Sequence, residues 1–211
     1  MIRFAKPYLL FAVLSIACWA QSAQVSITKP VHGLPTRQKA AQSTTTNNGI
    51  QYHGGPVLNL PSGTNVYFIW YGDWSSNPGA KQILTDLVQR LGRSPYFNIN
   101  TAYYDIDKAG QQDPVFNKVN FVASVNDNYS MGQSLSDNDV FVLVGNHAGA
   151  DLPIDTNGVY FVLTSADVSE QEFGAFCAAH NSAQYTHGGT VILDLKVAFA
   201  RIENPRVCNP L

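Results

Sequence analysis

The sequence predicts an α/β fold, with α+β as an open alternative, built as a single layered domain in which helices cover a mixed sheet. Two segments, Val66–Tyr71 and Val159–Thr164, are apolar on both faces, as is typical of strands covered on both sides. Between them, Pro78–Leu91 carries apolar residues at helical spacing. A buried strand followed by an amphipathic helix is how layered domains of this class begin. The 211 residues suffice for one such domain.

The helix over Pro78–Leu91 has clear start and stop signals. Asn77 can cap its amino end, and Pro78 takes the first helical position, where its missing N–H costs nothing. Gly92 ends the helix, and Pro95 prevents its continuation. We expect one apolar stripe of this helix to face the core. That stripe consists of Ile83, Leu84, Leu87, Val88 and Leu91.

Three further strands are expected. Residues 101–106 and 118–125 are rich in aromatic and β-branched residues, and turn residues at Gly110 and Pro114 separate them. Val191–Arg201 has apolar residues at every second position, which predicts a strand.

Residues 134–149 fit two structures. Ser136, with Asp139 three positions later, resembles a capping box and favours a helix. The run "VFVLV" is β-branched and favours a strand. We favour the helix.

Residues 1–23 predict a secretory signal peptide. A basic start precedes the apolar run "YLLFAVLSIACWA", which is too short to span a bilayer, and cleavage is expected after Ala20 or Ala23. A lipid on Cys18 is the weaker alternative, because "SIAC" lacks the expected leucine. We therefore expect a secreted protein with no membrane segment after signal removal.

Composition agrees with export. Only 13% of residues are charged, about half the usual quarter. Loss of Arg3 and Lys6 with the signal reduces 13 basic side chains to 11, against 15 acidic ones, and this balance argues against nucleic acid as a partner. Residues 24–48 are polar and read as a flexible leader. The folded domain is expected over residues 49–211.

The cysteines of the mature chain predict one disulfide. Cys177 and Cys208 remain after signal removal, and two cysteines in an oxidising compartment most simply pair. A zinc site would be the alternative if Cys177, His180 and His187 converged. Their spacing fits no standard zinc motif, so we interpret the two histidines as loop residues near the disulfide and predict no metal.

Two aspartates follow the apolar strands. Asp73 stands in "WYGDW" and Asp167 in "LTSADV", and strand ends are where α/β folds place ligands. If they converge, they could face a ligand, perform acid–base chemistry or hold a cation. The alternative is that each caps the following turn or helix through its side chain.

Other candidate features are less specific. Trp70 and Trp74 could form a platform for a sugar, although core packing is the commoner fate of such residues. Asn128 begins an N-glycosylation sequon, which matters only in a eukaryotic secretory route. No nucleotide-binding loop, nucleophile elbow or His-Glu-x-x-His motif is present, so we predict no catalytic residue and no cofactor.

Four segments together resemble the Exordium family, also called phosphate-induced proteins. They are "YHGGPVL" (52–58), "VYFIWYGDWS" (66–75), "YSMGQSL" (129–135) and "VYFVLTSADV" (159–168). The resemblance implies a secreted protein, in plants located in the apoplast or cell wall and linked to growth and cell expansion. It implies no catalytic residue.

The carboxyl-terminal region departs from the family pattern. Family members usually continue beyond the position of Leu211 with a helix containing His-Glu-Leu-x-Glu and a Cys-rich end, so we expect that the C-terminal part of the family domain is missing here. Our first hypothesis is a non-enzymatic extracellular protein whose partner is a cell-wall glycan or another extracellular protein. The alternatives are a degenerate relative of a secreted zinc-dependent hydrolase and a glycan-binding cell-wall module.

Overall fold

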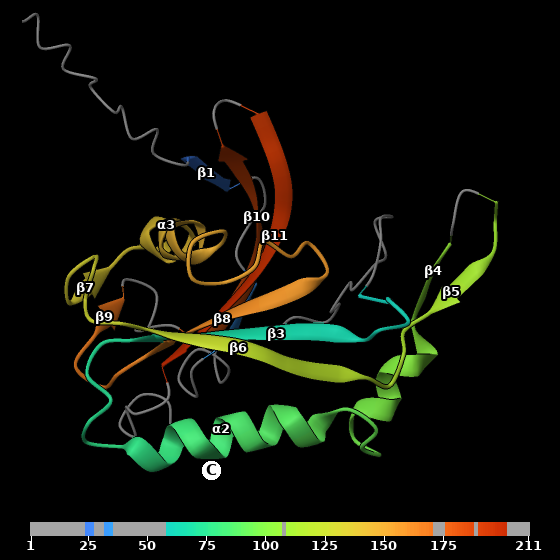
Figure 1. Ribbon diagram of the computed structural model, residues 1–211, viewed down its shortest axis with the longest axis horizontal. Helices are drawn as coiled ribbons and strands as arrows, with labels where there is room; N and C mark the ends of the chain where they lie inside the picture. The colour runs from blue at the N-terminus through green and yellow to red at the C-terminus, as the bar shows by residue number, and fades with distance from the viewer. Residues whose placement is uncertain are drawn as a thin grey trace, which may run out of the picture.

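A computed structural model of the chain confirms the predicted fold class, with helices on a mixed sheet in one domain (Figure 1). The structure describes residues 24–27, 32–35, 58–106, 109–170, 176–187 and 190–201. No helix among these residues is long and apolar enough to cross a membrane.

The main sheet has seven strands, and its parallel half carries the core. In spatial order this half runs β11 (Thr190–Arg201), β8 (Gly158–Thr164), β3 (Thr64–Tyr71) and β6 (Val119–Asp127). The three contacts between these neighbours are all parallel. The predicted strands over 66–71, 118–125, 159–164 and 191–201 are therefore confirmed.

The other half of the sheet is antiparallel and centres on β10 (Phe176–His187). This strand pairs with β11 on one side, and with β1 (Gln24–Ile27) and β2 (His32–Pro35) on the other. Both short strands fall within the predicted leader, 24–48, so eight residues of that range are paired with the sheet. The rest of the range lies outside the described residues.

Two helices cover opposite faces of the parallel half (Figure 1). Helix α2 (Pro78–Leu91) connects β3 to β6, and α3 (Asp137–His147) precedes β8. Side chains on one face of β3 pack with Trp74 and Val88, and those on the other face pack with α3. Strand β3 is apolar on both faces because each face meets a helix layer.

Helix α2 has the predicted bounds and cap, since the Asn77 side chain accepts from the Ala80 amide at 3.3 Å. The prediction that the whole apolar stripe of α2 faces the core is only half right. Val88 is 8% exposed, whereas Ile83 is 68% and Leu87 55% exposed. Successive helical residues are turned by about 100°. Consequently one row of the stripe faces the sheet, and the row carrying Ile83 and Leu87 points away.

Helix α3 resolves the ambiguity of residues 134–149. Ser136 and Asp139 form the capping box that the sequence predicts. The β-branched run lies inside the helix, where Leu143 and Val144 are fully buried. Burial against the sheet thus overrides the strand preference of these residues.

The remaining short elements differ in part from expectation. Residues 101–106 divide between a 3-10 helix η1 (Phe97–Ala102) and β4 (Tyr104–Ile106). Strand β5 (Gln112–Pro114), in the segment expected to be a turn, pairs with β4 as a hairpin. Strands β7 (Ser134–Leu135) and β9 (Ser169–Glu170) form a small parallel pair at the opposite end of the molecule (Figure 1).

Candidate functional site

The carboxyl edge of the parallel strands is the best candidate site. The chain leaves β3 through α2 to reach β6 on one side, and then crosses by α3 to β8 on the other side of β3. In open α/β sheets, such a reversal separates the loops at the strand ends and creates a place for a ligand. The loops that meet here are residues 72–75, 128–133 and 165–168.

Tyr129 joins these three loops. Its hydroxyl donates to Asp167 Oδ2 at 2.6 Å and accepts from the Asp73 amide at 2.9 Å. The Tyr129 backbone has φ of 59°, in the left-handed region that aromatic residues rarely occupy. Surrounding contacts must hold this strained conformation, and strain of this kind concentrates at functional sites.

Three side chains fix the Asp167 carboxylate. Besides Tyr129, Ser165 donates its hydroxyl to Oδ1 at 2.6 Å and Gln133 donates its amide to Oδ2 at 2.9 Å. These hydrogen bonds, that from Ser165 foremost, hold the pKa of Asp167 below its ordinary value. The Asp167 side chain stays exposed, so it is ionised and in contact with solvent.

Asp73 caps the following turn through its side chain, one of the two roles that the sequence allows. Its Oδ1 accepts from the Ser75 amide at 2.8 Å, and hydrogen bonding from Ser75 lowers the pKa of Asp73. Asp73 is also exposed on the same edge. Gly72, with φ of 94°, lets this loop approach the next one, because a Cβ at Gly72 would lie 2.0 Å from the Ser165 hydroxyl oxygen.

A polar network centred on the buried Asp127 supports the loop that carries Tyr129. Asp127, at the end of β6, accepts from the Ser130 amide at 2.7 Å and from its hydroxyl at 2.6 Å. His147 Nε2 lies 2.9 Å from Asp127, and its Nδ1 lies 2.9 Å from Asp151. Burial acts to raise the pKa of Asp127, but the bonds from Ser130 and His147 outweigh it and lower that pKa. Ser130 thus bonds to a carboxylate, and both imidazole nitrogens of His147 are engaged.

The predicted ligand-facing tryptophans lie in the core. Trp70 is 3% exposed and Trp74 is 4% exposed. Their rings meet edge to face at 5.1 Å, and Lys81 Nζ lies 5.3 Å from the Trp70 ring centre. The two indoles therefore belong to the core on the α2 side of the sheet, and neither presents an open face to a sugar.

The two histidines considered for zinc lie on a strand and not in a loop, so the loop interpretation is wrong. His180 and His187 both belong to β10, seven positions apart. An extended strand rises about 3.3 Å per residue, so their backbones are roughly 20 Å apart and do not converge on one metal. Among the described residues, no three His, Cys, Asp or Glu side chains group to hold a metal ion. Cys208 and the Cys177 side chain lie outside the described part, so their disulfide stays a prediction.

Sequence reasoning found Asp73 and Asp167 but missed their partners. Tyr129, Gln133 and Ser165 escaped notice because no short motif marks them. A signal was present, however. Three of the four segments that carry the family resemblance, residues 66–75, 129–135 and 159–168, converge on this one edge. Asn128, the sequon residue, is exposed beside Tyr129.

The chemistry of the cluster favours binding over proton transfer. A general acid or base works best with a pKa near the working pH. Here hydrogen bonds lower the pKa of both aspartates, and the bond to Asp167 raises the pKa of Tyr129. The edge therefore offers fixed anionic acceptors, an amide and a hydroxyl to a ligand that carries hydrogen-bond donors.

Comparison with known proteins agrees with the resemblance. The family model described as "Phosphate-induced protein 1 conserved region" matches residues 50–210. The protein EXORDIUM-like 5 of Arabidopsis thaliana is 31% identical in an alignment 175 residues long, which covers 75% of this chain and 46% of that protein. This chain thus spans about half the length of that relative. No solved structure matches it significantly.

Proposed function

Since this chain belongs to the phosphate-induced protein family, we propose that it is a secreted, non-enzymatic binding protein that acts in the cell wall during growth and cell expansion. The family resemblance supports the extracellular setting. The predicted signal peptide, residues 1–23, supports the same location.

The proposal rests on the polar cluster at the carboxyl edge, which consists of Asp73, Tyr129, Gln133, Ser165 and Asp167. Tyr129 is held in a strained conformation that places its hydroxyl between the two aspartate loops. The carboxylates of Asp73 and Asp167 are exposed and have lowered pKa values, so they remain hydrogen-bond acceptors throughout the mildly acidic range. Such an arrangement holds a ligand well and transfers protons poorly.

A neutral glycan is the partner that this chemistry suits best. Sugar hydroxyls donate to carboxylates, and the Gln133 amide and the Tyr129 hydroxyl can complement a second hydroxyl. An acidic polysaccharide would be repelled by Asp73 and Asp167. An extracellular protein partner is the alternative, and the exposed position of the cluster allows it as well.

Binding is tested by calorimetric titration of the full mature chain with soluble neutral oligosaccharides, cellohexaose and a xyloglucan heptasaccharide. We expect saturable binding to at least one of them. Asp167→Asn should weaken that binding about tenfold, because a charge-assisted acceptor is lost. Asp113→Asn, on β5 at the opposite end, is the matched control and should leave it unchanged. Mass spectrometry after prolonged incubation should show intact oligosaccharide.

Two outcomes would contradict the proposal separately. Equal oligosaccharide affinity in both variants, or no oligosaccharide binding at all, would show that the carboxyl edge does not bind a glycan. An extracellular protein would then be the partner to test. Shortened oligosaccharide would instead overturn the non-enzymatic assignment.

Export makes an independent prediction. Expressed in a secreting eukaryotic host, the chain should appear in the medium with its amino terminus between about Gln21 and Val25, as signal cleavage requires. Amino-terminal sequencing checks this. A major species that begins at Met1 and stays inside the cell would contradict secretion.

A further inference from the structure

A large apolar cavity lies at the other edge of the parallel strands. It has a volume of about 550 Å³ and is lined by the amino ends of β3, β6 and β8, by the last turn of α2 and by η1. Leu58, Tyr103 and Val115, which lie just outside these elements, complete the lining. Well-packed interiors leave few voids larger than a water molecule. A hollow of this size falls within the 300–1,000 Å³ typical of small-molecule sites.

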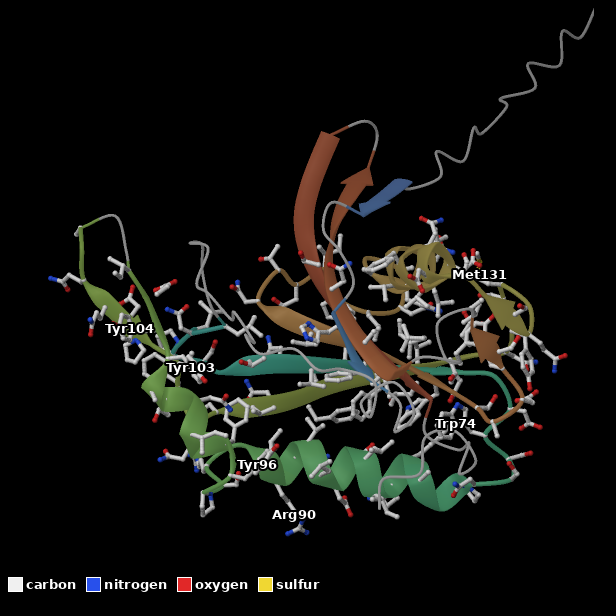
Figure 2. The ribbon with its side chains drawn as sticks, turned by 180° about the vertical axis from the view of Figure 1, so that it is seen from behind. Trp74, Arg90, Tyr96, Tyr103, Tyr104 and Met131 are labelled. Carbon is white, nitrogen blue, oxygen red and sulfur yellow. The ribbon has the colours of Figure 1, made fainter. Side chains whose placement is uncertain are left out.

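The cavity has a buried floor and an open mouth. On the floor, Val66 is 5% and Val88 8% exposed, and Val115 beside them is 9% exposed. At the mouth, Tyr103 is 65% exposed, and Phe97 is half-buried. Figure 2 shows Tyr103 near the hairpin, at the end of the molecule opposite Trp74 and Met131. A ligand can therefore enter beside Tyr103 and reach the sheet.

The cavity wall is almost wholly apolar and carries no charged side chain. Its polar members are Thr64, Asn100 and Tyr103. Thr64 already donates to the Leu58 carbonyl at 3.4 Å, and the Asn100 amide donates to the Phe97 carbonyl at 3.1 Å. Among the described residues, none forms a hydrogen bond with the Tyr103 hydroxyl. One free hydroxyl at the mouth of an apolar cavity can orient a ligand that has a single polar end.

We propose that this cavity binds a small, uncharged, apolar molecule with one terminal hydroxyl or carbonyl, such as a fatty alcohol or a comparable neutral lipid. The apolar part contacts the floor, and its polar end lies beside the Tyr103 hydroxyl. An anionic lipid is disfavoured, because no cation lines the wall to offset the loss of its hydration. This site is separate from the polar cluster at the carboxyl edge and does not depend on the function proposed for that edge.

The test uses the full mature chain and the neutral fluorophore N-phenyl-1-naphthylamine, with decanol as competitor. We expect one saturable site per chain, from which decanol displaces the fluorophore. Val159→Trp fills the cavity from β8 and should weaken fluorophore binding at least about tenfold by occupying its volume. Circular dichroism must show that this variant keeps the native fold.

A second pair of variants keeps the test decisive if Val159→Trp does not fold. Tyr103→Ala removes an exposed wall residue and should weaken the binding of both fluorophore and decanol. Tyr104→Ala, its exposed neighbour outside the cavity, is the matched control and should bind both like the unmodified chain. Fluorophore binding without saturation, or equal binding by the two tyrosine variants, would overturn the proposal.

Discussion

At their carboxyl ends, the parallel strands β3, β6 and β8 meet loops whose polar side chains bond to one another, whereas at their amino ends the same strands border an apolar cavity. The same strands form both edges, so the difference between the edges arises from the segments that connect the strands. Short loops at the carboxyl edge bring Asp73 and Asp167 to Tyr129. At the amino edge, η1 and the two residues that flank the β4–β5 hairpin, Tyr103 and Val115, leave a hollow against the sheet.

The largest expected loss of stability tests which residues of the apolar stripe of α2 pack against the sheet. Val88→Asp places a charge against the sheet and in the cavity wall, so it should lower the free energy of unfolding by about 3 kcal/mol. Leu87→Asp, one position away and 55% exposed, should change it by less than about 0.5 kcal/mol. Denaturant unfolding of the two variants measures the difference. Equal losses would mean that the whole stripe is buried, as the sequence alone suggested.

The next largest loss of stability is expected where the loop of Gly72 approaches the loop of Ser165 at the carboxyl edge. Gly72→Ala should lower the free energy of unfolding by about 2.5 kcal/mol, because it adds left-handed backbone strain and a clash with Ser165. Gly79→Ala is the matched control, since a Cβ there meets nothing within 4 Å. It should be neutral or slightly stabilising, because alanine favours the helix. A harmless Gly72→Ala would show that the two loops do not approach so closely.

A smaller, pH-dependent loss of stability is expected when Asp127, which supports the loop of Tyr129, is substituted. The folded pKa of Asp127 is lowered, so its contribution is present above its unfolded pKa of about 3.9 and is lost as the pH falls through the folded value. Asp127→Asn should therefore cost about 2 kcal/mol at pH 7 and progressively less as the pH falls below about 4. Urea unfolding of both proteins across this range gives the comparison. A cost independent of pH would show that the Asp127 charge is not what Ser130 and His147 stabilise.

Local sequence signals predicted the elements whose causes are local. The cap at Asn77, the capping box at Ser136 and the double-sided apolar character of β3 each depend on a few neighbouring residues, and each was found. Which helical row of α2 is buried depends on how the helix is turned against the sheet. The spacing of Ile83 and Leu87 does not contain that information.

The site was less predictable than the fold because its contacts are distant in sequence. Tyr129 meets Asp73 across 56 positions and Asp167 across 38. The sequence placed an aspartate after each strand, but only the sheet order brings their loops to one tyrosine. Strand β10 was missed for a similar reason. Its polar, alanine-rich sequence shows no clear alternation, and its pairing with β11 and the two amino-terminal strands makes it a strand.

The two edges are expected to act as separate binding sites, and a crossed titration tests this most directly. The unmodified chain, Tyr129→Phe and Val159→Trp are each titrated with the oligosaccharide that binds and with N-phenyl-1-naphthylamine. Tyr129→Phe removes only the bridging hydroxyl, so it should weaken oligosaccharide binding and leave fluorophore affinity unchanged. Val159→Trp should do the reverse. If either variant weakens both ligands equally while retaining the native circular dichroism spectrum, the two edges do not act as separate sites and this account is contradicted.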